Sequence, residues 1–265
     1  MPIPFALRST SIALLITLTI AEAGATWSIA AIHPRTQTIG VAAASCSGGV
    51  FGIQSVLSGV GVVIVQAESN ADARREAVAL LRDRKPLDAI LARLTDPQSG
   101  FVPERQQFAV LAVGSTQHPR TYTGADTPDV HADLSGEHFS VQGNTLASTE
   151  VVPKTVAALG TPDWPDDLAM ARALMRALQA GATAGGDRRC GSAASNSAFI
   201  SLHRAHDLQD APWLTLAVNR MAVGESSATD ALATLFAHWQ REDMARSSTV
   251  TFVVPAAHEA AKPRE

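Results

Sequence analysis

The stretch TWSIAAIHPRTQTIGVAAAS, residues 26–45, predicts a β-hairpin. Two short apolar segments flank the residues PRTQ, whose proline lacks a backbone N–H and therefore suits a turn. With PRTQ as the loop, His33 pairs with Thr38, and stepping back along both strands pairs Thr26 with Ser45. This register predicts that two hydroxyl side chains meet at the open end of the hairpin.

The residues before Thr26 carry the three parts of a secretory signal peptide. MPIPFALRSTS has one positive charge and no acid, IALLITLTIA is apolar, and AEAGA ends in small residues. The apolar part is too short to span a bilayer, which requires about 20 residues. Cleavage after Ala25 exposes Thr26 and is favoured here; cleavage after Ala23 is the alternative, as is a buried first helix. We therefore expect a leader at residues 1–25 and a periplasmic or secreted protein without a stable membrane anchor.

The composition is that of a globular domain. The chain has 265 residues, is 46% hydrophobic and carries a formal net charge of −4, so it lacks the basic footprint of a nucleic-acid-binding protein. The eight histidines are scattered, and the sequence holds no zinc motif and no phosphate-binding loop. We expect one domain at residues 26–255, a disordered tail at 256–265, and neither metal nor cofactor.

Hydrophobic periodicity places strands and helices in mixed order, which favours an α+β fold over a parallel doubly wound sheet. Residues 48–59 are Gly-rich and are expected to form a loop. Two antiparallel sheets stacked between helical layers fit the elements. The predicted strands are 26–33, 38–45, 60–67, 107–114, 191–204, 212–220 and 248–255, and the predicted helices are 70–84, 86–94, 148–159, 165–186 and 227–242.

Thr26 is a candidate nucleophile if it becomes the first residue of the mature chain. A threonine hydroxyl attacks well only when a base removes its proton. A terminal α-amine has a reference pKa near 8, so an N-terminal threonine carries its own base for neutral pH. The alternative is an ordinary strand-start residue.

Three further groups are candidates for supporting this chemistry. Asn144, in VQGNTLAS, would present an amide to a developing oxyanion, with a simple turn as the alternative and with Gln142 expected on the other face. Asp187 would orient the terminal ammonium, or would merely cap a turn. The candidates for binding a substrate are Ser45, Gln66, Arg188 and Arg189.

The two cysteines, Cys46 and Cys190, predict a disulfide in an exported chain, since an even count permits pairing. Such a bond would hold the GGDRR segment against the end of the hairpin beside Thr26. Two free buried thiols are the alternative.

Together, TWSIAAIHPRTQTIGVAAAS, VQGNTLAS and AGGDRR resemble the bacterial family catalogued as domain of unknown function 1028, which is assigned to the Ntn (N-terminal nucleophile) hydrolases. The resemblance implies a four-layer αββα sandwich and hydrolysis of an amide or peptide-like bond in a small-molecule or peptide-like substrate. It also makes a homo-oligomer compatible with the fold. Proteasome-type members place a lysine after the first hairpin, but this chain has none there; Lys85 falls where two predicted helices meet, and Lys154 falls on a predicted helix. The competing hypothesis is therefore a non-catalytic module that binds a cell-envelope ligand.

Overall fold

The computed structural model describes residues 26–128, 130–191, 193–219, 230–241 and 250–253. The predicted leader at residues 1–25 and the predicted tail at 256–265 lie outside these ranges. The described residues form eleven strands, five α-helices and three short 3-10 helices, an α+β composition as predicted.

The strands are β1 (Thr26–Ile32), β2 (Ile39–Ser45), β3 (Gln54–Leu57), β4 (Gly61–Ala67), β5 (Gln106–Ala112), β6 (Arg120–Thr123), β7 (Ala132–Ser135), β8 (Phe139–Asn144), β9 (Ser197–His203), β10 (Leu214–Val218) and β11 (Val250–Val253). The α-helices are α1 (Ala71–Arg82), α2 (Leu87–Thr95), α3 (Val151–Leu159), α4 (Asp167–Thr183) and α5 (Ala231–Arg241). The 3-10 helices are η1 (Phe51–Ile53), η2 (Pro103–Arg105) and η3 (Arg188–Cys190).

The β1–β2 hairpin has the predicted register. Thr26 pairs with Ser45 at the open end. At the other end the His33 amide donates to the Thr38 carbonyl at 2.8 Å, which closes the turn. Every residue of both strands is buried, so this hairpin lies in the middle of the molecule.

The strands form two sheets. The seven-stranded sheet has the order β11-β10-β9-β2-β1-β8-β7, and the four-stranded sheet has the order β3-β4-β5-β6. All strand pairs are antiparallel except β10 and β11, which run parallel. The expectation of two antiparallel sheets is therefore right apart from this edge pair, which α5 connects.

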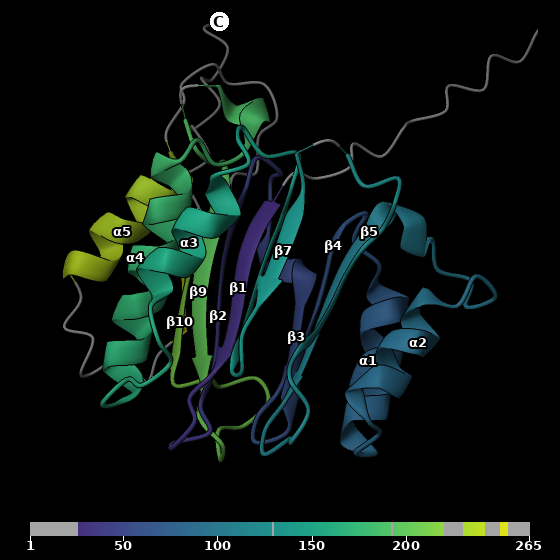
Figure 1. The fold of residues 1–265 in the computed structure, drawn as a ribbon. Coiled ribbons are helices and arrows are strands. Elements are labelled where there is room, and N and C mark those ends of the chain that lie inside the picture. Colours follow the sequence, from purple (N-terminus) through teal and green to yellow (C-terminus); the bar gives the residue numbers. More distant parts are fainter. Residues whose placement is uncertain (1–25, 129, 192, 220–229, 242–249, 254–265) are drawn as a thin grey trace, which may run out of the picture.

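The sheets stack between two layers of helices (Figure 1). Helices α3, α4 and α5 cover the outer face of the seven-stranded sheet, and α1 and α2 cover the outer face of the four-stranded sheet. Side chains from the two inner faces form an apolar core between the sheets, as expected for stacked sheets with alternating strand residues. Members of that core include Ala30, Ile32, Ile39, Val41, Val62, Ile64, Ala109 and Leu111.

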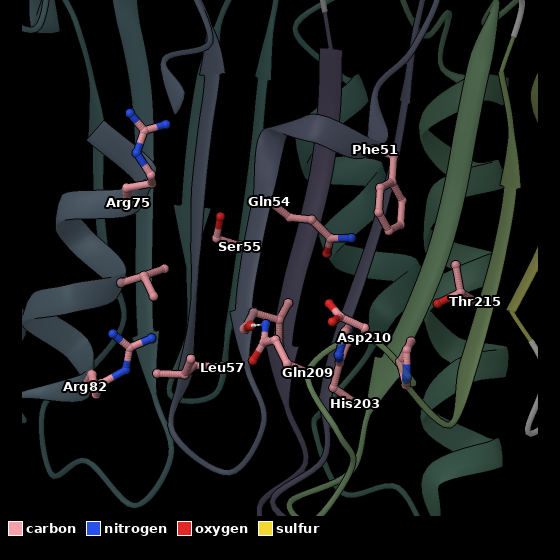
Figure 2. A pocket seen from close by; sticks show the side chains of 13 residues that line it. Phe51, Gln54, Ser55, Leu57, Arg75, Arg82, His203, Gln209, Asp210 and Thr215 are labelled. Atoms are coloured by element: carbon pink, nitrogen blue, oxygen red, sulfur yellow. Dashed lines mark hydrogen bonds between the residues drawn. The ribbon is translucent and has the colours of Figure 1, made fainter. Parts of the chain in front are cut away.

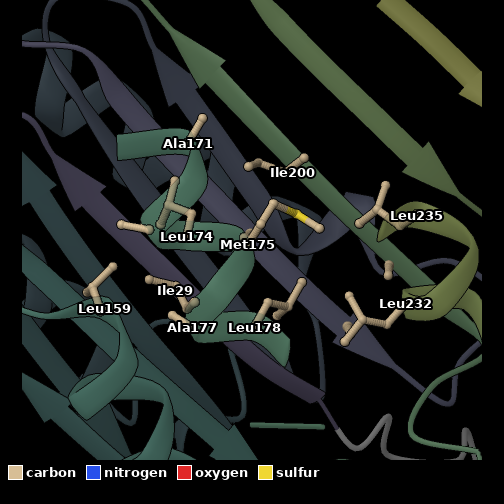
Figure 3. Packing of buried hydrophobic residues seen from close by; sticks show 14 of the residues in the cluster. Ile29, Leu159, Ala171, Leu174, Met175, Ala177, Leu178, Ile200, Leu232 and Leu235 are labelled. Atoms are coloured by element: carbon tan, nitrogen blue, oxygen red, sulfur yellow. The ribbon is translucent and has the colours of Figure 1, made fainter. Parts of the chain in front are cut away.

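Helix α4 packs tightly on the central strands (Figure 3). The Trp27 indole of β1 donates to the Leu178 carbonyl at 3.2 Å. A Cβ at Gly181 would lie 2.6 Å from the Trp27 Nε1, so only glycine lets the helix approach this closely. Helical spacing on α4 supplies the rest of this contact, with Met170, Ala171, Leu174, Met175, Ala177 and Leu178 all buried.

The prediction of a loop at residues 48–59 was wrong. The structure places η1 and β3 there, and β3 pairs with β4 through a short turn closed by the Val60 amide and the Leu57 carbonyl at 2.9 Å. Gly59 has a φ of 68°, a conformation that suits glycine in this turn. The glycines indicated a loop because one of them, Gly59, forms the turn. Whether the neighbouring residues form a strand depends on their pairing with β4, which composition does not specify.

The start of α1 follows its sequence signal. Asn70 is the N-cap, and its side-chain oxygen accepts from the amides of Asp72 and Ala73 at 2.9 and 3.0 Å.

Candidate functional site

Thr26 occupies the end of a central strand. It pairs with Ser45 of β2 on one side and with Asn144 of β8 on the other. Its side chain is almost wholly buried, at 3% exposure, and its hydroxyl donates to the Ser45 hydroxyl at 3.2 Å. Three of the predicted site residues thus lie in one row across the sheet, as the hairpin register predicted for the first two.

Below this row, the inner face of β1 changes from polar to apolar. Ser28, two residues after Thr26, donates to the Gln66 side-chain oxygen at 2.6 Å and so faces the four-stranded sheet. Ala30 and Ile32 continue on the same face into the apolar core. Along β1 itself, the inward-facing side chains are therefore polar at the Thr26 end and apolar further along.

Three side-chain amides link the two sheets at this end. The Gln66 amide donates to the Gln107 side-chain oxygen at 2.9 Å, and the Asn144 amide donates to the same oxygen at 3.0 Å. The Gln107 amide donates to the Gly143 carbonyl at 3.0 Å. Since Gln66, Gln107 and Asn144 are fully buried, these bonds satisfy groups that would otherwise be costly to bury.

Gln107 was not among the predicted site residues, and Gln142 lies on the face opposite to the predicted one. Gln107 begins a predicted strand, and only its place opposite β8 shows its role. Gln142 and Asn144 point the same way: the Gln142 amide donates to the Phe108 carbonyl at 2.6 Å, which also belongs to the four-stranded sheet. The expectation that Gln142 faces away was wrong, because residues two apart on a strand share a face.

Two residues beside this network have left-handed backbone conformations. Ala67, directly after Gln66, has a φ of 66°, and Thr145, directly after Asn144, has a φ of 51°. Such conformations are uncommon for residues other than glycine, and they cluster at functional sites where the surrounding structure holds them. Both bends end a strand at the polar side of the inter-sheet space.

Asp187 reaches this end of the hairpin from the segment after α4. The carboxylate is fully buried, and its Oδ2 accepts from the Cys46 amide at 2.7 Å. Arg189 donates to it from the backbone amide at 3.0 Å and forms a salt bridge at 2.9 Å. Asp187 therefore does cap η3, the alternative role, and it also fastens η3 to the end of β2.

A disulfide joins Cys46 to Cys190. It spans 144 residues of sequence and links the end of β2 to the end of η3, alongside the Asp187 bond. The predicted pairing is thus present, in place of two free thiols. Together the covalent and polar links hold the GGDRR segment against the residue that follows Ser45.

The two predicted arginines differ in their surroundings. Both residues are exposed; Arg189 forms a salt bridge with Asp187, whereas the backbone amide of Arg188 donates to the Thr145 carbonyl at 3.3 Å. Among the lysines that the structure describes, Lys85 lies between α1 and α2 rather than on a helix, and Lys154 is exposed on α3.

Within the described ranges, no group of three or more His, Cys, Asp or Glu residues has a metal-binding arrangement. None of the helices in the same ranges is long and apolar enough to cross a membrane.

Comparisons with known proteins identify a family and a similar fold. Residues 26–225 match the model of a family of unknown function, DUF1028. The chain belongs to DUF1028. This DUF1028 protein also resembles a crystal structure of a protein from Silicibacter pomeroyi assigned to the same family, with a TM-score of 0.61 and 24% identity over 83% of this chain and 92% of that chain. That likeness concerns the fold. A search of curated proteins found no match.

Proposed function

We propose that this DUF1028 protein is an exported Ntn-type hydrolase of amide or peptide-like bonds, with Thr26 as nucleophile and its own α-amine as base. The single observation that carries the proposal is the position of Thr26 at the start of a central strand, between Ser45 and Asn144. The family match, which begins at residue 26, adds support, since the leader pattern ends at the residue before.

The chemistry begins when cleavage after Ala25 frees the Thr26 amine. The neutral amine takes the proton of the Thr26 hydroxyl while Oγ1 attacks the substrate carbonyl carbon, and the carbonyl oxygen becomes an oxyanion. The ammonium returns the proton to the leaving amine, which leaves an ester on Oγ1. Water, deprotonated by the same amine, then hydrolyses that ester and restores Thr26.

Two features of the site fit these steps. The Asn144 amide donates one N–H to Gln107, which holds its side chain in place and leaves the second N–H for an oxyanion. The Ser45 hydroxyl accepts from the Thr26 hydroxyl at 3.2 Å, which orients the nucleophile from the neighbouring strand.

The second candidate is a module of the same fold that binds an envelope ligand without turnover. The surroundings of Lys85 and Lys154 favour it, since neither lysine belongs to the group of side chains around Thr26. The charge of Asp187 is also compensated by Arg189, so this carboxylate has a structural partner already.

Mass spectrometry of exported protein distinguishes the two. Under the hydrolase proposal the mature chain starts at Thr26, and an electrophile such as an epoxyketone modifies it once; Thr26→Ala abolishes the adduct. A start at Gly24, or a Thr26 start that leaves the electrophile unreacted while the protein is folded, would support the binding module instead. The Thr161→Ala variant, at an exposed position between α3 and α4, serves as the matched control and should label normally.

A further inference from the structure

A cavity lies away from Thr26. It has a volume of about 830 Å³ and opens between α1 and β3 on one side and β9 and β10 on the other (Figure 2). His203, on its wall, pairs with Ile39 at the turn end of the hairpin, whereas Thr26 pairs with Ser45 at the opposite end. The cavity is therefore a separate site, and its size is typical of pockets for small molecules.

His203 is the most informative group in this cavity. Its side chain is 6% exposed, and neither ring nitrogen has a hydrogen-bond partner among the residues that the structure describes. Burial lowers the pKa of His203 to about 4, although Asp207 acts in the opposite direction. At neutral pH the ring is uncharged and offers one donor and one acceptor to a ligand.

Two glutamines on the cavity wall each have a polar group that is available to a ligand, one a donor and the other an acceptor. The Gln54 oxygen accepts from the Ser201 hydroxyl at 3.2 Å, which leaves its NH₂ group as a donor. The Gln209 amide donates to the Val56 carbonyl, which leaves its oxygen as an acceptor. A donor and an acceptor of this kind match the C=O and N–H of an amide bond.

Opposite charges stand on the two sides of the cavity. Arg82 projects from α1 on one side, and Asp210 lies near His203 on the other (Figure 2). Neither forms a salt bridge within the described part of the chain, whereas the neighbouring Arg75 is paired with Asp72. Phe51, Leu57 and Pro212 supply apolar surface to the wall.

We propose that this cavity binds a short peptide with free termini. Arg82 takes its carboxylate, Asp210 takes its ammonium group, and His203 with the two glutamines hydrogen-bonds its amide groups. A zwitterion with internal amides and apolar side chains satisfies each of these groups at once, which a simple anion or a hydrocarbon does not. This binding is independent of catalysis at Thr26.

Calorimetric titration of the full exported chain carrying Thr26→Ala tests the proposal, because this background removes the proposed nucleophile while the cavity stays intact. The probes are the tripeptide alanyl-leucyl-alanine and its N-acetylated and C-amidated forms. We expect the free tripeptide to bind, and Arg82→Ala or Asp210→Ala to weaken binding about tenfold, as loss of one charged contact commonly does. The controls Arg172→Ala and Asp126→Ala, at exposed positions away from the cavity, should leave binding unchanged.

The N-acetylated and C-amidated peptides identify which peptide terminus binds Arg82 and which binds Asp210. Amidation of the C-terminus should weaken binding to the parent protein but not to the Arg82→Ala variant. Acetylation of the N-terminus should weaken binding to the parent protein but not to the Asp210→Ala variant. ¹⁵N spectra of the imidazoles should show a shift of His203 on binding. Absence of binding, or binding indifferent to both blocking groups and both variants, overturns the peptide site. Epoxyketone labelling of wild-type Thr26 is scored separately, so either proposal can fail alone.

Discussion

The Thr26 hydroxyl donates a hydrogen bond to the Ser45 hydroxyl at 3.2 Å, across two strands whose pairing places these residues directly opposite. The Ser45 oxygen also accepts from the Ser47 amide and hydroxyl, both at 3.0 Å. Ser45 thereby ties the orientation of Thr26 to the first residues after β2, the same segment that Asp187 and the disulfide hold.

Ser45→Ala should reduce reaction at Thr26 without unfolding the protein. The substitution removes the oxygen that accepts from the Thr26 hydroxyl and from Ser47, so we expect a loss of about 1–2 kcal/mol in unfolding free energy. The rate of adduct formation at Thr26, followed by mass spectrometry, should fall about tenfold or more. An unchanged rate would show that Ser45 does not orient Thr26, the proposed nucleophile. Ser99→Ala, in a loop next to α2, is the control.

Gln107→Leu should destabilise the link between the sheets. It leaves the buried amides of Gln66 and Asn144 without an acceptor, and each such loss costs about 1–3 kcal/mol. We expect a lower denaturant midpoint, together with slower labelling of Thr26 because Asn144 loses its anchor. Gln98→Leu, at an exposed position, should change neither quantity. Wild-type stability in Gln107→Leu would mean that these bonds contribute little.

Cys46→Ser should lower stability by about 2–5 kcal/mol, because the disulfide restricts the unfolded chain over a long loop. Cys190→Ser and the double variant should lose the same amount, since all three remove one bond. A reducing agent should lower the Tm of the wild type and leave the Tm of Cys46→Ser unaltered. Additive losses in the double variant would contradict the pairing.

Asp187→Asn should lower the unfolding free energy by about 1–3 kcal/mol, because it weakens the hydrogen bonds of a fully buried carboxylate to the Cys46 amide and to the partly exposed Arg189. The Asn side chain keeps an acceptor for the Cys46 amide but lacks the charge that faces Arg189. Asp163→Asn is the matched control, because its salt bridge with Arg35 is exposed and worth no more than about 1 kcal/mol. Equal effects in urea unfolding would argue against a structural role for Asp187.

The lowered pKa of His203 predicts that the free energy of unfolding decreases in mild acid. Its folded-state pKa of about 4 lies below the ordinary 6.5, so the unfolded chain binds more protons between these values. The contribution of neutral His203 to the free energy of unfolding is fully present above pH 6.5 and is lost as the pH falls toward 4. The total loss is about 3 kcal/mol. The difference in unfolding free energy between His203→Gln and the wild type should therefore change across this window. Parallel pH profiles would contradict a buried neutral ring.

Local patterns were enough for several parts of this fold. The turn PRTQ and the apolar segments on either side set the β1–β2 register, because pairing in a hairpin propagates from its loop. The cap at Asn70 and the helical spacing of α4 likewise depend on neighbours within a few residues. The disulfide followed from there being only two cysteines in a chain with a leader-like start.

Sequence alone therefore determined the hairpin, the cap of α1 and the two residues that meet at the open end, since each depends on short-range spacing. Only the tertiary structure decided that β8 lies against β1, that Gln107 joins Gln66 to Asn144, and that His203 faces a cavity beside β3. These relationships arise where strands distant in the chain pair and the two sheets stack. Such contacts form when apolar faces from distant parts of the chain are buried together. The spacing of residues along the sequence does not specify which distant strands pair, or in which register.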